Sequence, residues 1–374
     1  MKVALLIHSL AFGGAERQVT MLARGLAERG HRVHLVTLYD HDELKRDLQG
    51  TAVECVSLGK RGRGDLVGFG WRFVRAFCSI RPHVIYSFLP MQNLLTMLLK
   101  IPGAKWRIVW GVRASRVELS LYGGVSRITH RLALVGARVG VPDRIVCNSF
   151  AARNELLGEG VSPERIAVVP NGIDCRRFRP MGERRSVGRQ AMGFDPEDIV
   201  LGFVGRIDPM KDLPTLLRGF AMVAHSDRRL HLACVGNGPE TYRSSLRQLV
   251  RELGVRDRVR WFAARENVED IYNAIDLLVS PSRSSEGFSN VIAEAMACGV
   301  PCVVTDVGDS ARIVGPVGTV IPPKNAGRLA EAITEQLARR GSADSIRKSI
   351  ESRFGLDAMV DSTEAILAAL VRSN

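Results

Sequence analysis

Short apolar segments alternate with helical patterns along this chain of 374 residues, and the alternation occurs in two successive series. The apolar segments of the first series are residues 2–8, 33–38, 84–87, 107–110 and 144–148. Those of the second series are residues 199–204, 231–235, 259–262, 277–280 and 301–305. Short β-branched segments with helices between them are typical of parallel sheets covered on both faces. The pattern predicts an α/β protein with two similar parallel sheets in tandem, joined near residues 170–180.

The net charge of +13 is concentrated in the first half of the chain. Residues 1–170 include 24 basic and 13 acidic residues, or +11, whereas residues 171–374 include 28 and 26, or +2. Residues 51–150 alone hold 15 basic and 4 acidic residues, with Lys60, Arg61 and Arg63 among the basic ones. An excess of this kind attracts nucleic acid, an anionic membrane surface or a phosphorylated acceptor.

Several protein classes are not supported by the sequence. No apolar run is long enough to span a bilayer, and the apolar N-terminus fits a buried first strand better than a signal peptide. The seven cysteines show no paired spacing, which argues against a disulfide framework or a zinc site, and Cys298 and Cys302 fit small buried positions. The segment Asp40-His41-Asp42 is expected in a solvated loop rather than at a metal. We expect a protein of the reducing cytoplasm.

The loops after the strands of the second series carry charged and glycine-rich chemistry. Such loops meet at the carboxyl edge of a parallel sheet, where ligands bind. Arg206 and Lys211 follow one strand, and Gly287 precedes a helix expected to begin near Asn290. Backbone N–H groups at a helix start and two cationic side chains suit an anion. The pattern predicts a diphosphate site that requires no metal ion.

Two glutamates flank the start of that helix, eight residues apart. Glu286 lies before the helix and Glu294 lies inside its first turns, so the two carboxylates are expected to contact different parts of one ligand. Carboxylates accept paired hydrogen bonds from vicinal hydroxyls, which a sugar or a ribose offers. The fragment Gly236-Asn237-Gly238 lacks the third glycine of a dinucleotide fingerprint and is interpreted as a strand-to-helix turn.

The segment from Glu286 to Pro301 resembles the E-x7-E signature of the retaining family 4 glycosyltransferases. The resemblance extends over nearly the whole chain and includes Gly13-Gly14-Ala15-Glu16-Arg17, Asn171-Gly172-Ile173-Asp174 and Val204-Gly205-Arg206 with Lys211. It implies the GT-B fold, with two Rossmann-like domains whose parallel sheets face across a cleft. It also implies an N-terminal acceptor domain, residues 1–170 with a returning C-terminal helix in 356–374, and a donor domain, residues 171–355.

The resemblance further implies a role for each matching position in the donor site. Arg206 and Lys211, after Gly205, would hold the donor diphosphate. Glu286 would contact hydroxyls of the transferred sugar, and Glu294 would bind the nucleotide ribose. The loop that meets the sugar and phosphate through its backbone amides would comprise Gly287, Phe288, Ser289 and Asn290.

Two further regions complete the implied site. Gly13 and Gly14 match a loop that closes over the donor, and Arg113 lies near the position that relatives give to a His or Arg beside the reacting carbon. The chain departs from the family pattern at Ala263, where a glycine is usual. It also departs at Ser289-Asn290, which bears on sugar choice.

These features predict a hexosyl- or N-acetylhexosaminyltransferase that uses a UDP- or GDP-sugar as donor, with no cofactor and no metal. The resemblance implies retention at the anomeric carbon. A front-face reaction is favoured over double displacement because no side chain is recognisable as a nucleophile. The basic first half favours reversible association with the anionic inner face of the cell membrane and an acceptor that carries a lipid or lipid diphosphate. The resemblance implies that this acceptor is a lipid-linked saccharide, in polysaccharide or glycolipid biosynthesis.

Alternatives come from other functional classes. A nucleotide-sugar epimerase can share the fold and would not release nucleotide. A nucleic-acid-binding protein would explain the pI of about 9.9, but no such module is recognisable and aromatic residues make up only 6%. His8, at the end of the first strand, fits either a structural role or a place in the site. Trp71, Phe73 and Phe77 fit a helix that packs its apolar side on the domain.

Overall fold

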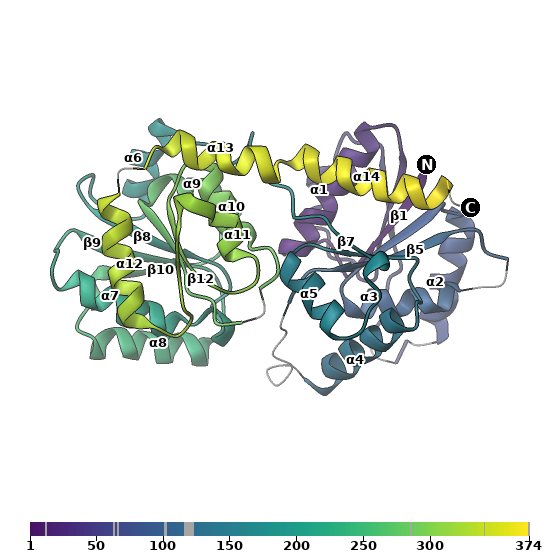
Figure 1. Cartoon of the computed structure of the whole chain (residues 1–374), viewed down its shortest axis with the longest axis horizontal. Helices are drawn as coiled ribbons and strands as arrows, with labels where there is room; N and C mark the ends of the chain where they lie inside the picture. The colour runs from purple at the N-terminus through teal and green to yellow at the C-terminus, as the bar shows by residue number, and fades with distance from the viewer. Residues whose placement is uncertain are drawn as a thin grey trace. The chain divides into compact units, whose positions relative to one another are not determined.

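The computed structural model describes residues 1–11, 13–62, 64–65, 67–100, 103–115, 123–284, 286–339 and 341–372. Arg63 of the basic segment lies outside these residues. The chain divides into two compact units, coloured by residue number in Figure 1. Unit 1 comprises Met1–Gly172 and Leu356–Asn374, and unit 2 comprises Ile173–Gly355. The sequence-based boundary was placed between residues 170 and 171.

Unit 1 is built on a seven-stranded parallel sheet in the order β3-β2-β1-β4-β5-β6-β7. Its strands are β1 (Lys2–Ile7), β2 (Arg32–Thr37), β3 (Val53–Ser57), β4 (Val84–Phe88), β5 (Arg107–Val112), β6 (Arg144–Cys147) and β7 (Ile166–Val168). Strand β1 lies between β2 and β4, and its residues Val3 to Ile7 are fully buried because helices cover both faces. The alternating pattern therefore predicted the sheet, although β3 and β7 were not recognised.

Helices cover both faces of this sheet. They are α1 (Gly14–Glu28), α2 (Val67–Ile80), α3 (Pro90–Leu95), α4 (Gly124–Arg138), α5 (Phe150–Gly158) and α14 (Leu356–Arg372), with 3₁₀ turns at Lys45–Leu48, Thr96–Leu99 and Pro163–Arg165. Local chemistry sets some of the helix starts. For example, the Ser149 hydroxyl caps α5 by accepting a hydrogen bond from the Ala152 amide at 3.1 Å, a contact typically worth about 1 kcal/mol.

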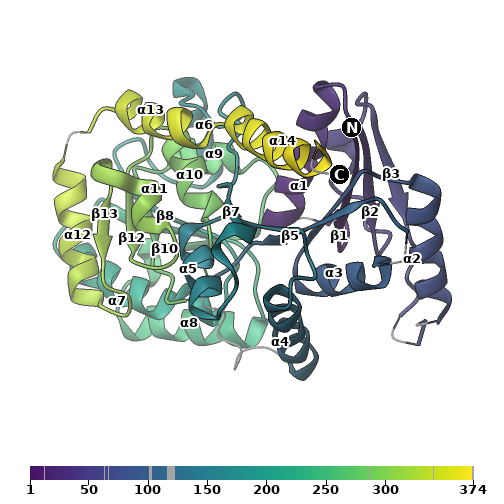
Figure 2. The ribbon, with the colours of Figure 1, turned by 45° about the vertical axis from the view of Figure 1, so that its right-hand side comes forward.

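The C-terminal helix α14 packs against α1 within unit 1, as Figures 1 and 2 show from two directions. Gly25 of α1 allows the close approach, since a Cβ at this position would lie 2.6 Å from a Val360 methyl group. At the edge of the contact, Arg29 pairs with Asp361 at 2.5 Å. Residues from the two ends of the chain therefore share one hydrophobic core.

Unit 2 contains a six-stranded parallel sheet in the order β10-β9-β8-β11-β12-β13. The strands are β8 (Ile199–Val204), β9 (Leu230–Val235), β10 (Val259–Phe262), β11 (Leu277–Ser280), β12 (Cys302–Thr305) and β13 (Thr319–Ile321). The second series of apolar segments predicted all of these except β13, which has only three residues. Two parallel sheets in tandem are thus confirmed.

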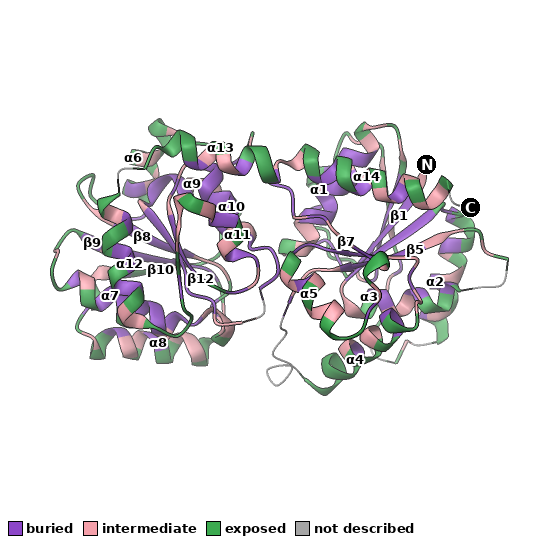
Figure 3. Cartoon of the chain, viewed as in Figure 1, coloured by how far each residue is buried: buried purple, intermediate pink, exposed green. Residues whose placement is uncertain are grey.

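Eight helices of unit 2 are described: α6 (Gly182–Ala191), α7 (Leu213–Ala224), α8 (Glu240–Glu252), α9 (Val268–Ala274), α10 (Asn290–Ala297), α11 (Ser310–Val314), α12 (Ala326–Ala338) and α13 (Ala343–Phe354). Short 3₁₀ turns occupy η5 (Pro209–Lys211), Arg256–Arg258 and Gly315–Val317. Figure 3 shows the strands buried between helices whose outer faces are exposed. Cys298 and Cys302 are buried, as expected for small interior residues.

The surface of unit 1 differs from expectation at one helix. Phe73 and Phe77 of α2 are buried in the core, but Trp71 is 60% exposed, and the Arg75 guanidinium lies 4.8 Å from its ring centroid. The apolar side chains of α2 therefore do not all pack on the domain. Among the described residues, no helix has the length and apolar character needed to cross a membrane.

Candidate functional site

Lys211 lies at the carboxyl edge of the unit 2 sheet because of the turn that follows β8. Gly205, the residue after the strand, has φ of +150°, a conformation that disfavours a side chain. The Lys211 Cε lies 4.0 Å from where a Gly205 Cβ would stand. Asp208 then caps η5 by accepting a hydrogen bond from the Met210 amide at 3.0 Å. Lys211, the last residue of η5, is thereby held over the end of β8.

A three-residue polar cluster joins this lysine to the loop after β11. The Lys211 ammonium donates to Glu286 Oε1, and the Ser282 hydroxyl donates to the same oxygen at 2.7 Å. The side chains of Lys211 and Glu286 are only 19% and 11% exposed. Paired charges at low exposure are positioned with little freedom, so the two groups predicted to hold the diphosphate and the sugar meet at one point.

The loop that carries Glu286 is fixed by its backbone. The Asp309 amide donates to the Gly287 carbonyl at 3.1 Å. Gly308 has φ of +61°, and a Cβ there would come within 2.5 Å of the Glu286 carbonyl oxygen. Phe288 is buried and packs edge-on against Phe354, with ring centroids 5.1 Å apart. The loop therefore delivers the chain to α10 in a defined conformation.

Helix α10 begins at Asn290, as the sequence predicted, and no side chain of Ser289 caps it. Glu294 lies in its second turn and is 5% exposed. The hydroxyl of Tyr272, a fully buried residue of α9, donates to Glu294 Oε2 at 2.8 Å. Sequence reasoning missed Tyr272, because one tyrosine in an apolar helix segment gives no signal of its partner.

The structure separates the two predicted basic residues. Arg206 is 74% exposed along its side chain, and its Nη2 lies 3.5 Å from Asp208 Oδ2. Lys211, in contrast, is mostly covered and paired with Glu286. The two cations therefore occupy different environments. Only the lysine belongs to the cluster with Glu286 and Ser282, which is called the Lys211 cluster below.

The glycines after β9 have a packing role. Gly236 has φ of +152°, and a Cβ there would lie 1.8 Å from the Gly205 carbonyl oxygen. A Cβ at Gly238 would lie 2.0 Å from the Ile207 carbonyl oxygen. These glycines let the turns after β8 and β9 touch, which agrees with their interpretation as a strand-to-helix turn. The Asn237 side chain accepts a hydrogen bond from the Ala264 amide at 3.2 Å, next to the atypical Ala263.

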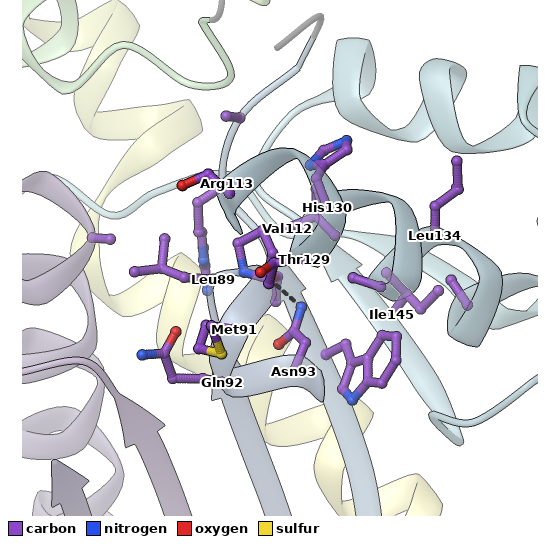
Figure 4. Close-up of a pocket in the computed structure, with 18 of the residues that line it drawn as sticks. Leu89, Met91, Gln92, Asn93, Val112, Arg113, Thr129, His130, Leu134 and Ile145 are labelled. Carbon is purple, nitrogen blue, oxygen red and sulfur yellow. Dashed lines mark hydrogen bonds between the residues drawn. The ribbon is translucent and has the colours of Figure 1, made fainter. Parts of the chain in front are cut away.

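Unit 1 contains a cavity of about 500 Å³ at the carboxyl edge of its own sheet. Figure 4 shows it between α3, α4 and the end of β5. Its lining includes His8, Leu89, Met91, Gln92, Asn93, Trp110, Val112, Arg113, Val125, Thr129, His130, Ala133, Leu134, Ala137, Ile145 and Leu156. The volume falls within the range of roughly 300–1,000 Å³ that is usual for small-molecule sites.

Arg113 is one of the predicted site residues, and it lines this cavity. Its Nη2 donates to the Tyr86 hydroxyl at 2.9 Å, and its Nη1 donates to Asn171 Oδ1 at 3.3 Å. The guanidinium also lies 4.7 Å from the ring centroid of Phe88. These contacts fix the side chain at the end of β5.

His8 follows β1 and also lines the cavity. Its Nδ1 lies 3.3 Å from Gln92 Nε2, and its ring lies against Tyr39 with centroids 4.7 Å apart. Partial burial, then the nearby His41 and Lys60, lower the pKa of His8. Burial therefore favours the uncharged form of the ring.

The glycine pair Gly13-Gly14 starts α1, as the sequence indicated. Gly13 is extended, and a Cβ there would lie 2.1 Å from Glu16 Oε2. Burial raises the pKa of that carboxyl group. Asp40, His41 and Asp42 are exposed after β2, and no group of three or more His, Cys, Asp or Glu residues within the described ranges is arranged to hold a metal ion.

Comparison with known proteins identifies the family. Residues 12–177 match the model described as Glycosyltransferase Family 4, and residues 198–339 match Glycosyl transferases group 1. A D-inositol 3-phosphate glycosyltransferase of Geodermatophilus obscurus is 30% identical over 385 aligned positions, which cover 96% of this chain and 85% of that protein. The chain belongs to glycosyltransferase family 4.

Other relatives of this family 4 chain align over a shorter region. D-inositol 3-phosphate glycosyltransferase 2 of Catenulispora acidiphila is 36% identical over 251 residues, covering 63% of this chain and 58% of that protein. The matched region thus spans little more than half the length of that relative. Among solved structures, Anabaena Alr3699/HepE in complex with UDP-glucose aligns with a TM-score of 0.86 at 22% identity, covering 99% of this chain and all of that one. The α/β GT-B fold with two Rossmann-like domains is confirmed.

Proposed function

We propose that this family 4 member is a retaining glycosyltransferase that moves a hexosyl or N-acetylhexosaminyl group from a UDP- or GDP-sugar to a lipid-linked saccharide. The observation that carries the proposal is the cluster of Lys211, Glu286 and Ser282 beside the start of α10 in unit 2. It combines a cation for phosphate, a carboxylate for sugar hydroxyls and the N-terminal end of a helix at one sheet edge.

The cluster suggests how the leaving group is stabilised. As the bond between the anomeric carbon and the phosphate oxygen breaks, negative charge develops on the nucleotide diphosphate. Lys211, the α10 N–H groups and the exposed Arg206 would neutralise that charge without a metal ion. The acceptor oxygen would bond to the anomeric carbon on the same face. Its proton would pass to the departing phosphate oxygen, which balances the reaction without an enzyme nucleophile.

Glu286 and Glu294 would divide recognition of the donor. Glu286 lies next to the cation and would accept hydrogen bonds from hydroxyls of the transferred sugar. Glu294 would accept hydrogen bonds from the ribose, with its carboxylate oriented by Tyr272. UDP-glucose is the first donor to test, because the similarly folded Anabaena protein was crystallised with it.

The acceptor is assigned to unit 1, with Arg113 beside the reacting carbon. Both relatives named above carry D-inositol 3-phosphate in their names, so that compound is the first soluble acceptor to test. The excess of positive charge in residues 51–150 supports an acceptor with a lipid phosphate or diphosphate, and peripheral association with an anionic inner membrane leaflet.

A panel of nucleotide sugars tests the proposed function. Thermal shift with UDP- and GDP-linked hexoses and N-acetylhexosamines should identify one donor, and acceptor addition should release nucleotide. NMR of the product should show the anomeric configuration of the donor. Conversion of the nucleotide sugar to an epimer with no release of nucleotide would instead establish an epimerase, and inversion would overturn the proposed stereochemistry.

Liposome sedimentation tests the membrane part of the proposal. Binding should require anionic lipid, weaken as salt rises, and fall when Lys60 and Arg61 are changed to Glu. If the wild-type protein does not bind anionic vesicles at low salt, the acceptor must be sought among soluble compounds.

A further inference from the structure

The wall of the cavity in unit 1 is mainly apolar. Leucine, methionine, valine, isoleucine and alanine side chains make up most of it, and the lining also includes Trp110, which is only 2% exposed. A wall of this composition favours a ligand that buries hydrocarbon, because each apolar contact removes surface from water.

Several polar residues in the wall already have partners within the protein. Asn93 accepts a hydrogen bond from Ser87 at 2.8 Å and donates to the Gly111 carbonyl at 3.3 Å, the contact drawn in Figure 4. Thr129 donates to the Val125 carbonyl at 2.7 Å, and the Trp110 indole donates to Thr96 at 2.8 Å. These groups are therefore committed to the fold rather than to a polar ligand.

The cavity is polar at one end. Figure 4 shows Gln92 and Arg113 on one side, together with the apolar Leu89 and Met91, and shows Leu134 and Ile145 on the other, with His130 between the two sides. The polar side includes the carboxyl ends of β1 and β5, where the proposed acceptor chemistry is located. A ligand that matches both ends is an amphiphile, with its polar group near Arg113 and its chain toward Ile145.

Helix α4 forms one wall of the cavity and is apolar on its outer side as well. Val125, Ile128, Leu132 and Val135 are 67%, 59%, 53% and 51% exposed, and Val139 just beyond the helix is 73% exposed. Their spacing of three or four residues, repeated, places them along one side of the helix. Isolated exposed apolar residues are ordinary, but a continuous row on one helix indicates an interaction surface.

The charge next to this row indicates what covers it. Arg127, Arg131 and Arg138 are spaced by four and seven residues and so form a second row beside the first, in which Arg138 also pairs with Glu159. Helix α4 contains no acidic residue. An apolar row flanked by arginines is complementary to an anionic lipid surface, where apolar side chains enter the interface and arginines meet phosphates.

We propose that the cavity binds the apolar chain of the membrane acceptor, and that α4 lies on the bilayer from which this chain enters. The inference rests on the proposed function, which it extends by assigning the chain to a site. Val125 links the two features, since it lines the cavity and is also part of the exposed row. The chain would thus pass from lipid to protein along apolar side chains.

Calorimetry with butyl, octyl and dodecyl phosphate tests the cavity. The affinity of the wild-type protein should rise by about threefold to fourfold per added CH₂ until the chain fills the cavity. The change Ala133→Phe, which fills the cavity from α4, should abolish this dependence. Ala365→Phe, at an exposed position of α14, is the matched control and should preserve it. An affinity independent of chain length in the wild-type protein would overturn the proposal, even if Ala133→Phe fails to fold.

Vesicle sedimentation tests the outer face of α4. The double variant Ile128→Glu/Leu132→Glu should lose at least tenfold in affinity for phosphatidylcholine vesicles that contain phosphatidylglycerol. The control Val187→Glu/Met222→Glu adds the same charge at residues of unit 2 that are 66% and 55% exposed, and should bind like the wild type. Equal binding by both double variants would show that α4 does not face the bilayer.

Binding of UDP and GDP separates the two proposals. All of these variants should bind nucleotide like the wild type, because the changes lie outside the Lys211 cluster. Normal chain and vesicle binding without nucleotide binding would defeat the proposed transferase and leave the chain site in place. Normal nucleotide binding without chain and vesicle binding would leave the proposed transferase in place and overturn the chain site.

Discussion

The two sheets place different pairs of side chains at corresponding points. In both units the first strand in sequence lies beside the fourth, as β1 beside β4 and β8 beside β11, which is the switch point where such sheets bind ligands. In unit 2 the loops after these strands bring together Lys211 and Glu286. In unit 1 the residue after β1, His8, meets Gln92 of helix α3, which follows β4.

This difference matches the chemistry proposed for each unit. A lysine paired with a carboxylate can exchange its partner for a phosphate. The His8 imidazole, whose uncharged form is favoured by burial, lies beside an amide and offers hydrogen bonds without strong charge. Beside the first pair lies a tightly packed turn with glycines at Gly205 and Gly236, and beside the second lies an apolar cavity. If both proposals hold, the same scaffold binds an anion in one unit and an amphiphile in the other.

The largest effect is expected from removing the charged pair. Lys211→Ala should remove about 2–4 kcal/mol of transition-state stabilisation, which lowers turnover by roughly thirtyfold to 900-fold. Arg206→Ala should reduce turnover less, because its side chain is 74% exposed and screened by solvent. Steady-state kinetics with circular dichroism as a check on folding measures both. A greater loss for Arg206→Ala would place the diphosphate away from the Lys211 cluster.

A smaller effect is expected at the ribose carboxylate. Glu294→Ala should weaken UDP or GDP binding by roughly 1–3 kcal/mol, since it removes an acceptor and leaves the buried Tyr272 hydroxyl without this partner. Tyr272→Phe keeps the carboxylate and should cost less. Calorimetry measures the nucleotide affinity of each variant. Glu286→Ala provides the contrast, because it should weaken binding of the sugar part of the donor more than binding of the nucleotide. Unchanged nucleotide affinity in Glu294→Ala would exclude the ribose assignment.

Much of the fold was predictable because buried parallel strands leave a strong local signal. Segments such as 199–204 are short, apolar and bounded by helical patterns, and the structure places β8 at Ile199–Val204. Strand β3 was missed because its pattern is only partly buried, and β13 because three residues carry little information.

The site was predictable in its charged groups but not in their pairing. The sequence indicated Lys211 and Glu286 separately, since each follows a strand. It could not indicate that Ser282 would share a Glu286 oxygen with Lys211, or that Arg206 would be exposed. Such contacts depend on the exact geometry of two loops. The cavity in unit 1 had no sequence signal, because an apolar wall and an apolar core have the same composition.

A modest pH effect on stability is expected from His8 of unit 1. Because the pKa of His8 is lowered in the folded protein, the unfolded chain binds its proton first as the pH falls. Stability should therefore decline as the pH drops from about 6.5 through the lowered pKa, and His8→Gln should lessen that decline. His231→Gln in unit 2 is the comparison, since burial also lowers the pKa of His231. Denaturant unfolding at a series of pH values from about 6.5 downward measures how steeply the free energy of unfolding falls with pH. The same dependence in His8→Gln and in the wild type would contradict the prediction.

The smallest effect is expected from chelation. If the Lys211 cluster supplies the positive charge, activity should persist after exhaustive treatment with EDTA and dialysis. The assay compares treated enzyme with and without added magnesium or manganese. Complete loss of activity that only a divalent ion restores would mean that Lys211 and Arg206 do not suffice.

Gly172 and Leu356, the residues of unit 1 on either side of unit 2, are neighbours in space. The Gln18 side chain forms two hydrogen bonds with the backbone of Gly172, at 2.9 and 3.0 Å. A Cβ on Gly172 would lie only 3.0 Å from the Leu356 Cα, so the residues on either side of unit 2 are neighbours within unit 1. Unit 2 is therefore topologically an insertion between two adjacent points of unit 1. A deletion of residues 173–355, closed by a short glycine linker, should yield unit 1 as one continuous domain, α14 included, in which the cavity can be studied without the donor site.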